Sequence, residues 1–267
     1  QHSMSCVTTS ITHWIYSSRS GRDIECGAKE LESYEYMMRF IPNAFTVGNL
    51  FCGFLALHYV FQGNYVPAAW LIFLGAVLDK MDGKLARRMG NDSQFGIQFD
   101  SIVDVCTFGI VPTVLIYQAH LHTDWGMGLA FVFLLCGAIR LARFNTLSLE
   151  DERSEFYMGL SIPTAAICLT QYVVFVDAWQ SPHATPLAVL LVLLLGFLMV
   201  SRLDYDPIPN FRGTSFSDRF KQIYSVTTVG LTIYDSIFFF PMALIYIFSG
   251  FYRWIFRMFS NEVTQHA

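Results

Sequence analysis

The sequence predicts an all-α protein, a polytopic membrane bundle of about eight transmembrane helices. Of its 267 residues, 54% are hydrophobic and only 14% are charged, whereas roughly a quarter of the residues in soluble domains are charged. Long apolar stretches recur along the chain, and about 20 apolar residues suffice for a helix to cross a bilayer. The stretches are continuously apolar rather than alternating, which disfavours a membrane β-barrel.

Eight apolar runs define the expected spans. They cover residues 40–62, 66–90, 94–119, 124–146, 158–178, 185–201, 219–235 and 237–256. The polar segment 1–34 is expected to be a cytosolic tail. Residues 35–260 would form the membrane domain, and residues 261–267 a second tail.

The basic residues predict how these helices are oriented. All 17 Lys and Arg lie before the first run, at alternate junctions between runs, or near the end of the chain. The other junctions, such as "HLHTDWG", contain none. Because cytosolic loops carry the excess of Lys and Arg, every basic junction is expected to face the cytosol. Both ends of the membrane domain then lie on one side, which requires an even number of spans.

Composition also argues against other classes of site. The net charge of -4 provides no polycationic surface for nucleic acid. The six cysteines are scattered without CxxC spacing, and the seven histidines show no ligand pairing. We therefore expect neither a disulfide framework nor a zinc site.

Four aspartates stand out in the stretch "DKMDGKLARRMGNDSQFGIQFDSIVD". Asp79 and Asp82 are three residues apart, and Asp100 and Asp104 are four apart, so on helices each pair shares one face. The turn residues "GNDS" between the pairs predict an antiparallel helical hairpin, in which the pairs can converge. Ionised carboxylates this close to hydrocarbon repel one another unless cations neutralise them.

The ligand set predicts the kind of cation. Four carboxylates without a nearby Cys or His suit a hard divalent ion such as Mg²⁺, Mn²⁺ or Ca²⁺. Two such ions would bridge the oxygens of a phosphate or diphosphate. Alternatively, the aspartates are solvated helix ends neutralised by Lys80, Arg87 and Arg88. A cation transporter is a further alternative, but its carboxylates should lie near the bilayer midplane, whereas these flank the basic junction of the second and third runs.

Eight residues of this stretch match the signature of a known enzyme family at fixed spacing over 26 positions: Asp79-x2-Asp82-Gly83-x2-Ala86-Arg87-x8-Gly96-x3-Asp100-x3-Asp104. The chain thus resembles the CDP-alcohol phosphotransferases, membrane enzymes in which an alcohol displaces CMP from a CDP-activated lipid. The resemblance implies the fold of that family, a homodimer, and an active site at the cytosolic face. It also implies a divalent metal cofactor, Mg²⁺ or Mn²⁺, with Ca²⁺ as an alternative occupant.

The resemblance further implies roles for the site residues. Asp79, Asp82 and Asp100 would bind metal, while Asp104 would be the general base and would touch a second metal. The implied contacts with the CDP group come from Gly83, Ala86, Arg87, Gly96, Asn43 and Thr46. A helix cap and a helix hydroxyl explain Asn43 and Thr46 equally well. A general base is needed because an alcohol hydroxyl is too weak an acid to attack phosphorus unaided.

The acceptor alcohol is predicted from segments outside the signature. "RFIPNAFTVGNLFCGF", "DSIVDVCTFGIVP", "RLARFN" and "MVSRLDY" resemble the branch of the family that uses CDP-diacylglycerol and L-serine. Ser161 departs from that branch, which has proline there. Serine carries a carboxylate that needs a cation, and the candidate acceptor-binding residues are Arg140, Arg143 and Asn145, although positive-inside anchoring also explains the arginines. Glycerol 3-phosphate, inositol and inositol phosphate are the alternative acceptors.

Overall fold

The described part of the chain is almost entirely helical, which confirms the predicted all-α class. The structure is a computed structural model that describes residues 44–89, 94–149, 157–180, 182–201, 204–205, 224, 227–228, 236–248 and 250. Its helices are Ala44–Phe61, α3 (Tyr65–Met89), α4 (Gln94–Asp104), η1 (Val105–Ile110), α5 (Val111–His120), α6 (Asp124–Leu149), α7 (Ile162–Trp179), α8 (Ala184–Val200), the short η2 (Ser236–Phe238) and Phe239–Phe248. Strands β1 (Tyr157–Met158) and β2 (Asp204–Tyr205) pair antiparallel.

Six of the eight predicted spans coincide with helices to within a few residues. Among the described residues, four helices are long and apolar enough to cross a membrane: Ala44–Phe61, Phe95–His120, Asp124–Thr146 and Ile162–Trp179. The predicted span 219–235 lies mostly outside the described residues, and so does part of 237–256. The total of eight therefore stays a prediction. The predicted tails also lie outside the described residues.

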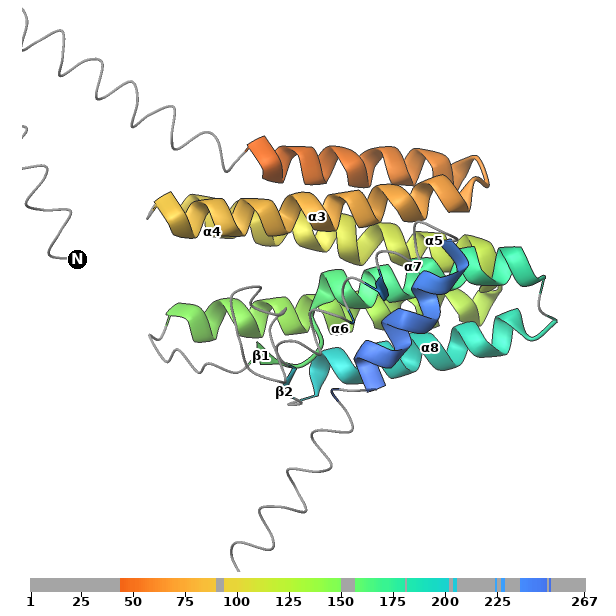
Figure 1. Ribbon diagram of the computed structural model, residues 1–267. Coiled ribbons are helices and arrows are strands. Elements are labelled where there is room, and N and C mark those ends of the chain that lie inside the picture. The colour runs from red at the N-terminus through yellow and green to blue at the C-terminus, as the bar shows by residue number, and fades with distance from the viewer. Residues whose placement is uncertain are drawn as a thin grey trace, which may run out of the picture.

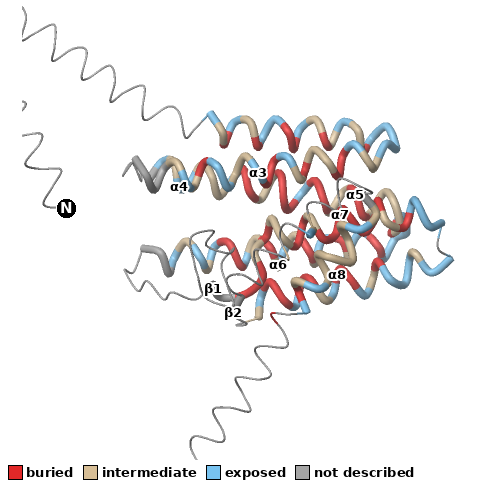
Figure 2. Tube along the Cα trace, viewed as in Figure 1, coloured by how far each residue is buried: buried red, intermediate tan, exposed pale blue. Residues whose placement is uncertain are grey.

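The helices pack lengthwise into one bundle (Figure 1). α6 packs along α8, and α3 packs along α7. Buried positions gather where the helices face one another, and exposed positions lie on the outer sides (Figure 2). Many large apolar side chains are exposed on those sides, including Phe51, Phe54, Phe131 and Phe197. An apolar outer surface of this extent is typical of a protein embedded in lipid.

The third predicted span is one helix with a π-helical segment inside it. α4 passes directly into η1 after Asp104, and η1 passes directly into α5. Thr107, Phe108 and Gly109 of η1 are buried. π-Helical segments are rare and frequently lie at functional sites. η1 begins at the residue directly after Asp104.

Candidate active site

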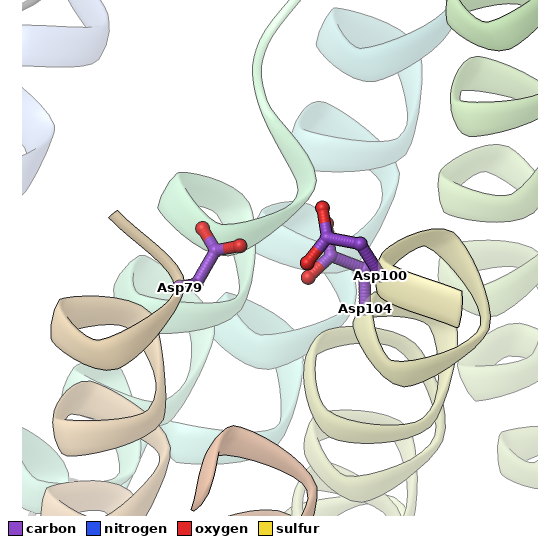
Figure 3. A group of neighbouring side chains, drawn as sticks. All are labelled: Asp79, Asp100 and Asp104. Atoms are coloured by element: carbon purple, nitrogen blue, oxygen red, sulfur yellow. The ribbon is translucent and has the colours of Figure 1, made fainter. Parts of the chain in front are cut away.

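Three carboxylates converge between α3 and α4. One carboxylate oxygen from each of Asp79, Asp100 and Asp104 lies within 4.8 Å of the others. Figure 3 shows Asp79 pointing from α3 across to the other two on α4. The structure thus brings together three of the four aspartates that the sequence predicts to converge. Oxygen atoms at this spacing could hold a metal ion.

Asp82 lies close by but outside that group of three. It sits one turn beyond Asp79 on α3 and is only 6% exposed. Its carboxylate accepts a hydrogen bond from the hydroxyl of Thr46, which is also buried. Thr46 therefore connects the Ala44–Phe61 helix to this carboxylate. The predicted role of Asp82 as a metal ligand stays a prediction.

Asp104 is the most enclosed of the three converging aspartates, with 8% of its surface exposed. Its Oδ1 atom is buried and has no hydrogen-bond partner within the described part of the chain. Burying a carboxylate oxygen without a partner is costly. The negative charges of Asp79 and Asp100 add to that cost, and the positive charge of Arg140 offsets part of it. A divalent cation at the cluster would relieve this repulsion, so the donor set fits such an ion.

The three predicted acceptor residues on α6 have different surroundings. Arg140 is 7% exposed and acts electrostatically on Asp104, and its guanidinium carbon lies 5.9 Å from the ring centroid of Phe144. Arg143 donates hydrogen bonds to the carbonyls of Val200 (3.2 Å) and Ser201 (3.4 Å), at the end of α8. Of the two arginines, Arg140 is thus the one that interacts electrostatically with the carboxylate cluster.

Asn145 lies near the end of α6 and contacts α4. Its Nδ2 donates a hydrogen bond of 2.8 Å to the hydroxyl of Ser101, the residue after Asp100. This contact holds the end of α6 against the helix that carries two of the converging aspartates.

The predicted CDP-binding residues are only partly described. Gly83 of α3 and Gly96 of α4 are half-buried in the helices that carry the aspartates. Ala86 and Arg87 belong to α3, but their side chains lie outside the described residues, and so does Asn43. The roles of these five residues in binding CDP stay predictions.

Two buried polar residues near the carboxylates, Asn49 and Thr107, were not predicted from the sequence. Asn49 is fully buried, and its backbone carbonyl accepts a hydrogen bond of 3.3 Å from the hydroxyl of Thr107 in η1. The available signal was an Asn three residues after Thr46 within an otherwise apolar run. A polar side chain in such a run must find a partner or pay a desolvation cost.

The segment before α7 also has a specific conformation. Gly159 has a φ of +79°, and the backbone N–H of Leu160 donates to the carbonyl of Leu198 at 3.1 Å. A Cβ atom at Gly159 would lie 2.6 Å from the carbonyl oxygen of Met199. This segment therefore rests on the end of α8, the same end that Arg143 contacts. Ser161, which stands where the serine-using branch of the family has proline, precedes the first residue of α7.

Comparison with protein families gives a match over most of the chain. The family model described as CDP-alcohol phosphatidyltransferase matches residues 39–234, which include the aspartate cluster. The chain belongs to this family. The family resemblance in the sequence analysis is therefore confirmed.

Several proteins that bear the name CDP-diacylglycerol–serine O-phosphatidyltransferase are similar to this chain over long stretches. The protein from Helicobacter pylori is 31% identical over 227 residues, which is 81% of this chain and 92% of the relative. The protein from Bacillus subtilis is 34% identical over 177 residues, 66% of this chain and 93% of the relative. The protein from Methanocaldococcus jannaschii is 32% identical over 170 residues, 64% of this chain and 75% of the relative.

Proposed function

We propose that this protein is a membrane enzyme that transfers the phosphatidyl group from CDP-diacylglycerol to the hydroxyl of L-serine and releases CMP. The observation that carries the proposal is the convergence of Asp79, Asp100 and Asp104 in a chain of the CDP-alcohol phosphatidyltransferase family. Relatives from three organisms, similar over most of their length, bear the name of this activity. They support serine as the acceptor.

A divalent metal, Mg²⁺ or Mn²⁺, is the proposed cofactor. Asp79, Asp82 and Asp100 would hold one ion, and Asp104 would touch a second. When bound, the metal neutralises the diphosphate of the substrate and makes CMP a better leaving group. The converging oxygens of Asp79, Asp100 and Asp104 support a metal at this cluster, because carboxylate oxygens are the ligands that such ions prefer. The assignment of Asp82 as a ligand rests on the family resemblance.

Asp104 is proposed as the general base. The serine hydroxyl oxygen forms a bond to the phosphorus that carries the diacylglycerol, the bond from that phosphorus to the CMP oxygen breaks, and the hydroxyl proton passes to Asp104. Its Oδ1 atom is buried without a hydrogen-bond partner among the described residues, so a lone pair is available to accept the proton. Its low exposure also keeps bulk water from competing with serine.

Arg140 is proposed to bind the serine carboxylate. It is a buried cation on α6 next to Asp104, and an arginine can pair with a carboxylate through two hydrogen bonds. The contacts of Arg143 and Asn145 favour supporting roles, since Arg143 binds the end of α8 and Asn145 binds Ser101.

The CDP group is proposed to lie against Gly83, Ala86 and Gly96, where small residues permit a close approach. Arg87, Asn43 and Thr46 would supply polar contacts. We also propose eight spans with the active site at the cytosolic face, because the basic residues at the end of α3 adjoin the aspartates: Lys80, Lys84, Arg87 and Arg88. Homodimer formation is a further proposal that follows from the family.

The decisive experiment supplies purified protein with CDP-diacylglycerol, Mn²⁺ and one candidate alcohol at a time, and measures CMP release. We expect release with L-serine and none with glycerol 3-phosphate, inositol or inositol phosphate. Release with glycerol 3-phosphate but not with serine would overturn the acceptor. Failure with every alcohol, together with cation flux into proteoliposomes, would favour the transporter alternative.

A further inference from the structure

Four residues form a close-packed layer beneath the carboxylate cluster, and we call them the Asn49 layer: Asn49, Gly53, Gly75 and Thr107. A Cβ atom at Gly75 would lie 2.7 Å from Oδ1 of Asn49 and 3.2 Å from Cγ2 of Thr107. A Cβ atom at Gly53 would lie 2.6 Å from Oγ1 of Thr107. The two glycines thus allow the polar side chains of Asn49 and Thr107 to sit between three helices.

Each of those helices carries a residue of the carboxylate site about one turn from this layer. Asn49 follows Thr46 by three residues, Gly75 precedes Asp79 by four, and Thr107 follows Asp104 by three. Residues three or four apart lie on one face of an α-helix, which relates Asn49 to Thr46 and Gly75 to Asp79. Thr107 belongs to η1, which begins directly after Asp104. The Asn49 layer therefore lies next to the carboxylate site, three or four residues from it along each helix.

The side-chain amide of Asn49 is buried in an otherwise apolar part of its helix. Asn49 has no exposed surface, and neither Oδ1 nor Nδ2 has a hydrogen-bond partner in the part of the chain that the structure describes. Leaving a buried donor or acceptor unsatisfied is costly, whereas an apolar residue of the same shape would avoid that cost. Buried polar groups are normally satisfied by protein or by ordered water. Oδ1 of Asn49 faces Gly75, which has no side chain to partner it.

A second buried polar atom without a hydrogen-bond partner among the described residues is Oδ1 of Asp104, which precedes Thr107 of this layer by three residues. An internal water typically makes about three hydrogen bonds. The Asn49 amide, the Asp104 carboxylate and the Thr107 hydroxyl would supply suitable partners.

We propose that Asn49 is a positioning residue for the carboxylate cluster, and that its amide orients Asp104 through an internal water. The inference rests on the proposed function in that the cluster must bind a divalent metal. Groups that orient a metal ligand change metal affinity by about 10- to 100-fold when they are removed. Asn49 acts through Asp104 and does not touch the substrate.

The test compares Asn49→Leu with Gln171→Leu in the purified full-length protein. Gln171 is a matched control because it is 1% exposed, and both of its amide atoms also lack partners among the described residues. It lies nine residues into α7, away from the aspartates. Mn²⁺ affinity is measured by titration, following the electron paramagnetic resonance signal of free Mn²⁺. We expect Asn49→Leu to weaken Mn²⁺ binding about tenfold, and Gln171→Leu to leave it unchanged.

Further readouts separate positioning from packing. Asn49→Leu should lower kcat for CMP release while the KM for serine stays constant, and its melting temperature should change no more than that of Gln171→Leu, because both variants replace a buried amide with an apolar side chain. Where Asn49→Leu does not fold, Thr107→Val, which keeps the side-chain shape, provides the same comparison. Mn²⁺ affinity at the wild-type value in the Asn49 or Thr107 variant would overturn the proposal. Equal losses in Asn49→Leu and Gln171→Leu would also overturn it.

The Mn²⁺ readout distinguishes this inference from the proposed activity. If the wild-type protein binds Mn²⁺ but does not use serine, the assignment of serine as the acceptor is wrong. The comparison of Asn49→Leu with Gln171→Leu still tests the positioning role of Asn49. Wild-type protein that binds no Mn²⁺ overturns the metal site, and with it the role of Asn49.

Discussion

The hydroxyl of Thr46 donates a hydrogen bond to the carboxylate of Asp82, although the two residues are 36 positions apart in the chain. This contact joins the Ala44–Phe61 helix to α3 at the level of the carboxylates. The site is consequently built by three helices rather than by the α3–α4 hairpin alone. It also gives Thr46 a defined partner on the protein, in addition to its proposed contact with CDP.

Removing the Thr46 hydroxyl should weaken metal binding. Thr46→Val keeps the shape of the side chain but leaves the buried Asp82 carboxylate without this donor. We expect about tenfold more Mn²⁺ to be needed for half-maximal CMP release. Thr46→Ser retains a hydroxyl and should stay close to wild type. An unchanged Mn²⁺ requirement in Thr46→Val would show that this hydrogen bond does not orient Asp82 for metal.

Replacing the proposed base should stop turnover without abolishing substrate binding. Asp104→Asn keeps the size of the side chain but cannot take the serine proton, so kcat should fall by at least about 100-fold. Binding of CDP-diacylglycerol in the presence of Mn²⁺ should persist in part, as measured by equilibrium binding with radiolabelled lipid. Asp177→Asn, an exposed position near the far end of α7, serves as the control and should retain activity. Near-normal turnover by Asp104→Asn would remove Asp104 as the base.

Arg140 and Arg143 should give different phenotypes when each is changed to Gln. Arg140 is proposed to bind the serine carboxylate, so Arg140→Gln should raise the KM for serine more than the KM for CDP-diacylglycerol. Loss of a charged hydrogen-bonding partner costs about 1.5 to 3 kcal/mol, which corresponds to roughly a tenfold to hundredfold higher KM. Steady-state kinetics with each substrate varied in turn provides the measurement.

Arg143→Gln is the comparison for that experiment. Arg143 donates to the carbonyls of Val200 and Ser201, so its loss should lower the melting temperature and leave the KM for serine little changed. A selective rise in the KM for serine in Arg143→Gln, and none in Arg140→Gln, would reverse the two assignments.

Much of the architecture follows from local signals in the sequence. Continuous apolar runs are visible without knowledge of tertiary contacts, so six predicted spans coincide with helices. The spacing of Asp79, Asp100 and Asp104 likewise predicts their convergence, because an antiparallel hairpin brings the two helix ends together.

Features that depend on contacts between distant segments could not be predicted in this way. The π-helical segment η1 lies where Thr107 packs against Gly53 and Gly75, and no periodicity in residues 105–110 reports those contacts. Arg140 and Arg143 are both basic residues on α6 in the sequence. Only the packing of α6 against η1 and α8 distinguishes them. Arg140 acts electrostatically on Asp104, whereas Arg143 hydrogen-bonds to the end of α8.

A Cβ atom at Gly159 should destabilise the segment that leads into α7. Gly159 has a φ of +79°, and its added Cβ would lie 2.6 Å from the Met199 carbonyl oxygen and 2.8 Å from that of Ser201. A left-handed conformation alone costs a non-glycine residue about 1 to 3 kcal/mol. The backbone collision adds to this cost, since the end of α8 must move. We expect Gly159→Ala to lower the melting temperature of the detergent-solubilised protein by several degrees.

Gly63→Ala separates the two contributions. Gly63 has a similar φ of +75°, but nothing lies within 4 Å of its added Cβ. Gly63→Ala should therefore show only the cost of the left-handed backbone conformation, and its melting temperature should fall less than that of Gly159→Ala. Gly128→Ala, in an open position of α6, should not destabilise the protein, because alanine favours a helix over glycine by about 1 kcal/mol. Equal falls for Gly159→Ala and Gly63→Ala would mean that the segment before α7 does not rest tightly on α8.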